Sequence, residues 1–411
     1  MFGEWPILAS NFKAGRRRSD ARRDDAWRNG ALREGVRLNR QQRLRVRCAG
    51  WLALLASALL AGCASEPEYQ PPSLTPEQAQ ALIASLLPKQ VRDRDGWALD
   101  IQSAFQAQSV VPSRENACAV IAVIEQESGF QVNPVVPGLP QIAWREIDRR
   151  AEAAGIPLFL VHGALRLSAA SGKSFGDRID HVRTEKDLSD IYEDIIGMVP
   201  MGKRLFAERN PVHTRGPMQV NVSFAQSYTA EHPYPYPLQS SLADELFTRR
   251  GSVYFGIAHL FGYSPPYDSL LYRFADYNAG QFASRNAAFQ RALGRLANMR
   301  LTPDGALLAR DASVKGAGST ARAAHGLAQR LQLDDREIDA ALAQAHRRDF
   351  ERTELYRRVF AAAELAAGRP VVRAFVPQIE LHGAKLSHAL STDWYAHRVN
   401  GRFQRCLAPR P

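Results

Sequence analysis

One acidic residue stands where the sequence could make it a general acid. Residues 117–124 are apolar on every side, which predicts a buried helix. Glu127 follows at the carboxyl end of this helix, on the line of Val120 and Val123 by helical spacing. Burial and the negative end of the helix dipole both favour the neutral carboxyl and raise its pKa. Such a carboxyl can protonate a leaving group near neutral pH. The alternative is an exposed glutamate in a fraying last turn.

Two short motifs follow Glu127 along the chain. Residues 215–221 read RGPMQVN, and residues 274–280 read FADYNAG. In this order, after Glu-Ser at a helix end, they resemble the goose-lysozyme-like lytic transglycosylases, which carry Glu-Ser, then Gly-Leu-Met-Gln, then Ala-Tyr-Asn-Ala-Gly. The matching positions are Glu127, Ser128, Gly216, Met218, Gln219, Tyr277, Asn278, Ala279 and Gly280.

The resemblance implies a lysozyme-like helical lobe with a groove for peptidoglycan. Glu127 would protonate the glycosidic oxygen and then, as carboxylate, deprotonate the muramyl 6-hydroxyl, which closes a 1,6-anhydro ring. Tyr277 would hydrogen-bond Glu127. A second carboxylate, which most glycosidases need, is not required because this hydroxyl replaces water. The implied substrate-binding residues are Ser128, Met218, Gln219, Tyr277 and Asn278.

The sequence departs from the family pattern in three ways. Pro217 replaces the Leu of the second motif, and Asp276 replaces the Ala before the Tyr of the third. Residues 131–210 form a large insertion that could roof or block the groove. Glu125 is an alternative acid, on the line of Cys118 and Ile121, but it lacks the Ser that follows the catalytic acid in the family.

The elements that must position these residues are helices. No set of alternating strands is present, so the fold class is mainly α, with the lysozyme-like lobe extended by helices over residues 300–411. The domain expected is 75–411, which begins at the capping residue Thr75. Helices are predicted over 76–87, 96–107, 114–128, 143–154, 184–198, 241–262, 268–277, 281–295, 320–331, 335–345 and 349–367.

The amino-terminal part of the chain predicts export and a lipid anchor. Residues 1–50 carry 13 Lys/Arg against 5 Asp/Glu, and an uncharged apolar run covers 48–62. Basic residues before a short apolar run are typical of a signal peptide. Leu60-Ala61-Gly62-Cys63 resembles the lipobox of bacterial lipoproteins, which implies cleavage before Cys63, attachment of acyl chains such as palmitate to Cys63, and anchoring in the outer membrane. Residues 63–74 read as a tether.

Two cysteines remain, Cys118 and Cys406, in a chain expected to enter an oxidising compartment. We predict that they form a disulfide that docks the carboxyl-terminal tail against the helix ending at Glu127, because that tail has no long apolar run to hold it. The alternative is one buried thiol and one free tail thiol.

Several functions are disfavoured. Residues 63–411 hold 40 basic and 37 acidic residues, with no dense basic tract, so nucleic-acid binding is not expected. The GKS at 172–174 lacks the glycine that a phosphate-binding loop needs five positions earlier. The histidines show no metal-ligand spacing, and neither a metal nor a cofactor is implied.

Over its length the chain also resembles the YaiW-like outer-membrane lipoproteins of unknown function, through AWREIDRRAE (143–152), VRTEKDLS (182–189), IGMVPMG (196–202) and FASRNAAFQ (282–290). Two functions remain open. The first is a lipid-anchored lytic transglycosylase acting on peptidoglycan. The second is a non-catalytic lipoprotein that uses a lysozyme-like fold to bind glycan, peptide or a protein partner.

Overall fold

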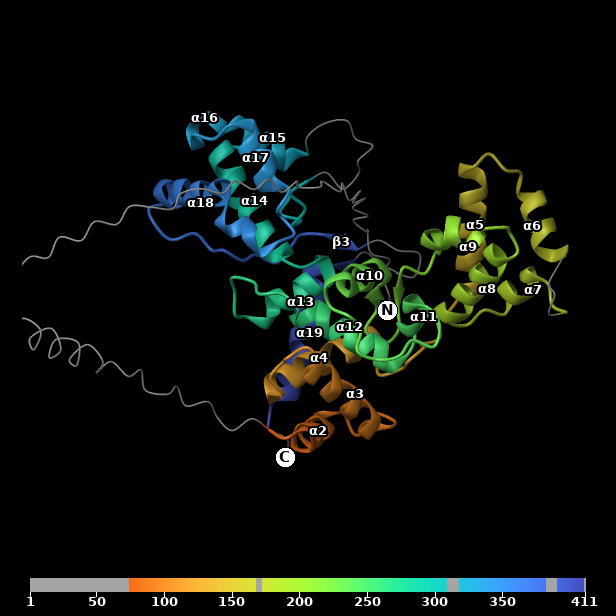
Figure 1. Ribbon diagram of the computed structural model, residues 1–411. Helices are drawn as coiled ribbons and strands as arrows, with labels where there is room; N and C mark the ends of the chain where they lie inside the picture. Colours follow the sequence, from red (N-terminus) through yellow and green to blue (C-terminus); the bar gives the residue numbers. More distant parts are fainter. Residues whose placement is uncertain (1–73, 168–171, 309–317, 382–389, 410–411) are drawn as a thin grey trace, which may run out of the picture. The chain divides into compact units, whose positions relative to one another are not determined.

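The computed structural model describes residues 74–167, 172–308, 318–381 and 390–409 (Figure 1). These residues are mainly helical, as the sequence predicts. The predicted signal peptide, the tether up to residue 73 and Cys63 lie outside the described residues. Within the described part of the chain, no helix combines the length and the apolar character needed to cross a membrane.

The first helical group surrounds α4 (Arg114–Glu127), the helix that ends at the candidate acid. Every residue from Ala117 to Ile124 is at most 2% exposed, so this helix is buried on all sides as its composition predicts. The other helices that contribute to this core are α2 (Pro76–Leu86), α3 (Arg94–Ala107), α10 (Val222–Glu231), α12 (Arg249–Phe261), α13 (Leu270–Ala279) and α19 (Thr392–Leu407).

The second helical group is built by the predicted insertion. Its core is small and centres on Leu139, Ala143, Ile179 and Ile191. The elements are α5 (Leu139–Ala153), α6 (Leu158–Leu167), α7 (Phe175–Asp180), α8 (Glu185–Gly197), α9 (Gly202–Phe206) and the 3-10 turn η1 (Ala207–Arg209). Ser174 of the GKS sequence is the N-cap of α7, so this sequence begins a short helix.

The third helical group follows α13 and has its own apolar core, in which aromatic rings pack around Phe289. Arg285 is fully buried and bonds the carbonyls of Ala345 and Arg347, which ties the FASRNAAFQ segment to this group. The elements are α14 (Ala283–Ala297), α15 (Ser319–Gly326), α16 (Ala328–Leu331), α17 (Asp335–Leu342), η2 (Arg348–Arg352) and α18 (Glu354–Ala367).

Strand structure in the described residues is limited to two short antiparallel ladders. β1 (Thr214–Arg215) pairs with β2 (Val220–Asn221), and the turn between them carries the second motif. β3 (Glu380–Leu381) pairs with β4 (Leu390–Ser391), directly before α19.

Three predicted helices are each broken in two. The span 241–262 divides into α11 (Leu242–Glu245) and α12 because Thr248 leaves the helical conformation and caps α12 with its hydroxyl. The span 320–331 breaks at Leu327, and 349–367 breaks at Thr353, which caps α18 in the same way. Threonine side chains that bond the backbone favour caps over helix interiors.

The prediction for the carboxyl-terminal tail is wrong in one respect. Residues 392–407 form α19, which lies against α4 and α13 and buries Tyr395, Val399 and Phe403 in the first core. The tail is therefore held by an amphipathic face as well as by a covalent bond. The missed signal is the spacing of Tyr395, Val399, Phe403 and Cys406, which places all four on one helix face.

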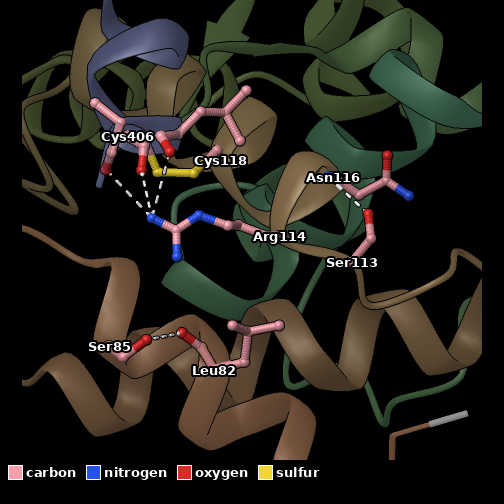
Figure 2. Close-up of a disulfide and its surroundings, with 9 residues drawn as sticks. Leu82, Ser85, Ser113, Arg114, Asn116, Cys118 and Cys406 are labelled. Atoms are coloured by element: carbon pink, nitrogen blue, oxygen red, sulfur yellow. Dashed lines mark hydrogen bonds between the residues drawn. A yellow bond between two sulfur atoms is a disulfide. The ribbon is translucent and has the colours of Figure 1, made fainter. Parts of the chain in front are cut away.

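The structure contains the predicted disulfide between Cys118 of α4 and Cys406 of α19 (Figure 2). The two Cα atoms lie 5.5 Å apart, within the range that a disulfide requires. Arg114 lies beside it and donates to the carbonyls of Cys406, Leu407 and Ala408 at 3.3–3.5 Å. The end of α19 is thus fixed to the beginning of α4.

Candidate functional site

Glu127 is buried at the carboxyl end of α4, with 5% of its surface exposed. Burial raises the pKa of its carboxyl from 4.5 to about 7, and the charge of Glu185 adds to this rise. A hydrogen bond from Tyr395 opposes the rise because it stabilises the charged form. The carboxyl is thus poised to change its protonation state near neutral pH, which is the property expected of a general acid.

Tyr395 of α19 donates its hydroxyl to Oε1 of Glu127. Its phenol is buried, which raises its pKa well above 10, and the nearby charge of Glu127 raises it further. This tyrosine therefore stays protonated and can only donate to the carboxylate. The family resemblance implies that Tyr277 makes this hydrogen bond to Glu127, but in the structure Tyr395 makes it.

Tyr277 of α13 is also buried, and the charge of Glu127 contributes to the rise of its pKa. Its hydroxyl donates instead to the carbonyl oxygen of Met218, at 2.7 Å. The third motif therefore supports the turn that carries the second motif. The ring of His259 contacts Tyr277 from α12, and its Nε2 lies 3.2 Å from the Tyr277 carbonyl.

The β1–β2 turn presents Gln219 from an unusual backbone conformation, with φ of +49°. Its side-chain amide donates to Oε2 of Glu185 at 3.2 Å, and its side-chain oxygen accepts from the hydroxyl of Thr214 at 2.8 Å. Gly216 opens the turn with φ of +72°, and a Cβ there would lie 2.0 Å from the carbonyl oxygen of Leu246. Glycine is therefore required at the position where the family motif also has it.

Glu185 is a second buried carboxylate at this site, and sequence reasoning did not identify it. It comes from the first turn of α8, in the insertion, and is 7% exposed. Its bond to Gln219 links the insertion to the second motif. The capping box of Thr184 and Asp187 marks where α8 begins, but nothing local in the sequence shows which way Glu185 turns.

The other predicted substrate-binding residues are all buried, and each is bonded within the protein. The hydroxyl of Ser128 donates to the carbonyl oxygen of Ile124. Asn278 accepts from Thr392 of α19 at 2.7 Å. Met218 is fully buried, and its backbone N–H donates to the Ser252 hydroxyl. The structure therefore gives these residues structural contacts in place of the sugar contacts that the resemblance implies.

Asp276, which departs from the family motif, has a clear structural role. It is fully buried and accepts hydrogen bonds from Tyr263, Tyr267 and the backbone N–H groups of Phe282 and Ser284. Burial raises its pKa to about 6. These contacts fix the turn from α13 to α14, so this departure serves the junction between the first and third helical groups.

Glu125, the alternative acid, turns away from Glu127. It pairs with Arg402 of α19 at 2.7 Å and is about one-third exposed, at 33% of its side chain. The same guanidinium also donates to Gln126. Glu125 thus belongs to an ion pair between α4 and α19.

The stability of the protein should fall between about pH 4.5 and pH 7 relative to that of a Glu127→Gln variant. The pKa of Glu127 is raised from 4.5 to about 7 in the folded protein, so the folded state binds more protons in this window. The contribution of the group is fully present below its unfolded pKa and is lost as the pH rises through its folded pKa. The shift corresponds to roughly 3 kcal/mol. Denaturant unfolding of both proteins across this range measures it, and an identical pH dependence would contradict it.

Comparison with known proteins identifies the family of the chain. No solved structure matches it. The chain is 44% identical over 364 residues to the "Uncharacterized protein YaiW" of Escherichia coli (strain K12), an alignment that covers 88% of this chain and 99% of that protein. Residues 90–409 match the family described as "Protein of unknown function (DUF1615)". The chain therefore belongs to the YaiW-like DUF1615 family.

Proposed function

We propose that this protein cleaves the glycan strand of peptidoglycan as a lytic transglycosylase, with Glu127 as the single catalytic acid and base. The observation that carries the proposal is a buried carboxyl at a helix end whose pKa lies at about 7. The neutral form donates a proton to the glycosidic oxygen, and the resulting carboxylate removes the proton of the muramyl 6-hydroxyl. Protonation and deprotonation by one group suit a pKa close to the working pH.

The surroundings of Glu127 support this role. Tyr395 holds one carboxyl oxygen and so orients the acid, and its hydroxyl stabilises the carboxylate formed after the first step. In this proposal the first helical group is the lysozyme-like lobe. Ser128, Gln219 and Asn278 would have to exchange their present partners for sugar N-acetyl groups when the site opens.

Purified protein incubated with isolated sacculi tests the proposal. Release of 1,6-anhydro-muropeptides, identified by mass, is the expected result. Products with a reducing end would instead indicate hydrolysis by water. Intact sacculi after long incubation would contradict the enzymatic function.

One observation favours a second candidate, a non-catalytic binding protein. The acid and the five predicted substrate-binding residues are each at most 6% exposed, and their polar groups are bonded within the protein: Glu127, Ser128, Met218, Gln219, Tyr277 and Asn278. A lysozyme-like fold retained for binding would keep these contacts closed. Saturable binding of the protein to sacculi without any released product would support this candidate over the enzyme.

We also propose that the protein is a lipoprotein of the outer membrane, anchored through Cys63. Incorporation of labelled palmitate into the protein is expected, and Cys63→Ala should abolish it. Cys48→Ala is the matched control, because Cys48 lies on the other side of the proposed cleavage site and should leave labelling unchanged. Label that survives Cys63→Ala would place the modification elsewhere.

A further inference from the structure

An elongated apolar cavity of about 380 Å³ runs through the second helical group, between α5 and α8. We call it the α5–α8 channel. The residues that line it recur every three or four positions on each helix, so the lining follows one face along each helix axis. The wall residues that show this spacing are Leu139, Ala143, Ile147 and Ala151 of α5, with Leu188, Ile191 and Ile195 of α8.

The walls of the channel follow most of the length of both helices. From Leu139 to Ala151 the wall of α5 extends about 18 Å, and from Glu185 to Ile195 the wall of α8 extends about 15 Å, at a rise of about 1.5 Å per residue. A mostly apolar wall of this length matches an extended hydrocarbon chain better than a sugar, which needs several hydrogen-bonding groups.

The two ends of the channel differ. A backbone bridge between Val135 and Thr184 holds the amino ends of α5 and α8 together, and there the buried Glu185 lines the channel. At the carboxyl ends the channel is lined by Ile156, which is 46% exposed, and by the half-exposed Arg150. The channel is therefore open beside Ile156, and we call this opening its mouth.

Exposed apolar side chains follow the carboxyl ends of both helices. Phe159 is 74% exposed and stands with Leu160 at the start of α6, just after α5 ends. Met198, Val199 and Met201 follow the end of α8 and are also exposed. Exposed apolar residues gathered around an opening are typical of sites that meet a lipid or another apolar ligand.

The polar groups in the channel wall are already bonded within the protein. Arg150 pairs with Glu146 at 2.6 Å and donates to the carbonyl of Arg209. Glu185 accepts from Gln219, and Tyr192 donates to the carbonyl of Phe206. Thr214 and His213 also line the wall, and the Thr214 hydroxyl donates to Gln219. The remaining wall residues are apolar, so the channel is suited to hydrocarbon.

We propose that the α5–α8 channel binds a single hydrocarbon chain, as in a fatty acid or the acyl chain of a lipid, which enters beside Ile156. This site does not depend on the proposed glycan cleavage. Its walls belong to the family segments around AWREIDRRAE and VRTEKDLS, for which the lytic transglycosylase resemblance offers no role.

Binding of a series of saturated fatty acids to the full chain carrying Cys63→Ala tests the proposal, because this change prevents acylation at Cys63. We expect one molecule of fatty acid to bind per molecule of protein. Each added methylene should tighten binding about fourfold until the hydrocarbon fills the length of the channel, after which affinity should level off. An affinity that keeps rising with every added methylene would indicate adsorption to the exposed apolar surface, and non-saturable binding would likewise overturn the proposal.

Two variants distinguish binding inside the channel from binding to the exposed surface of the protein. Ala143→Phe places a ring in the middle of the channel and should weaken palmitate binding at least tenfold, whereas Leu365→Ser on the exposed face of α18, away from the channel, should change it less than twofold. The reverse pattern would overturn the proposal. If Ala143→Phe does not fold, Ala151→Leu near the mouth provides the same test.

A separate set of binding measurements distinguishes a free fatty acid from a membrane lipid as the source of the hydrocarbon. Binding of free palmitate in the absence of lipid identifies a fatty acid site. Binding only when phosphatidylethanolamine vesicles are supplied, with the phospholipid recovered by native mass spectrometry, identifies a membrane lipid as the ligand. Recovery of neither from the wild-type protein would contradict a hydrocarbon site.

Discussion

Glu127→Gln is expected to reduce the release of anhydro-muropeptides from isolated sacculi by about 10²–10⁴-fold, which is the usual contribution of a general acid and base. Glutamine keeps the volume of the side chain and an oxygen that can accept from Tyr395, but it cannot donate a proton to the glycosidic oxygen. The melting temperature should stay the same or rise, because the variant no longer buries an ionisable carboxyl with a pKa of about 7. Mass analysis of products and thermal unfolding measure the two effects.

Glu125→Gln is the matched control for this variant. Both glutamates lie near the end of α4, but Glu125 is partly exposed and bound to Arg402. Turnover should therefore remain within a few-fold of that of the wild-type protein. Unchanged turnover in Glu127→Gln would remove the catalytic assignment, and loss of turnover in Glu125→Gln alone would transfer it to Glu125.

The parts of the site that could be predicted are those encoded locally. The apolar run 117–124 predicts a buried helix because no face of it carries a polar residue, and the structure has that helix. The position of Glu127 at its end, and the rise of its pKa on burial, follow from the same short stretch. The mainly helical class is likewise visible from capping residues and periodicity along the chain.

The partners of Glu127 could not be predicted because they come from distant segments. Tyr395 lies 268 positions further along the chain, in a helix that was not recognised as one. Glu185 comes from the insertion, which the sequence suggests could roof or block the groove, and its carboxyl lies against Gln219. Tertiary packing alone decides such pairings, and short motifs carry no information about them.

The motif residues have roles in packing as well as possible roles in chemistry. Gly216 is required by the close approach of Leu246, and Met218 packs against Gly256, where a Cβ would lie 2.4 Å from its sulfur. Tyr277 holds the Met218 carbonyl. A chain that keeps the fold of this turn would keep these residues whether or not it cleaves glycan. For this reason the resemblance supports the fold of the turn more strongly than the activity, and the Glu127→Gln experiment is needed.

Replacing both Cys118 and Cys406 by alanine is expected to lower the free energy of unfolding by about 2–5 kcal/mol. The disulfide spans 288 positions of sequence, and a loop of that length gives the largest gains in the chain-entropy account. Because α19 also packs by its apolar face, the variant should still fold. Thermal and denaturant unfolding of the oxidised protein and the variant measure the difference, and a change below about 1 kcal/mol would contradict the expectation.

Arg114→Ala is the control for this region, because Arg114 fixes the same end of α19 through hydrogen bonds to Cys406 and its neighbours (Figure 2). Its loss should cost only about 1 kcal/mol, since these bonds are partly exposed.

The disulfide also affects the candidate site, because Tyr395 belongs to the helix that the disulfide secures. If α19 unfolds locally in the cysteine variant, the carboxyl of Glu127 becomes hydrated and loses its hydrogen bond from Tyr395. The difference in stability between pH 4.5 and 7 that depends on Glu127 should then shrink in the cysteine variant and persist in Arg114→Ala.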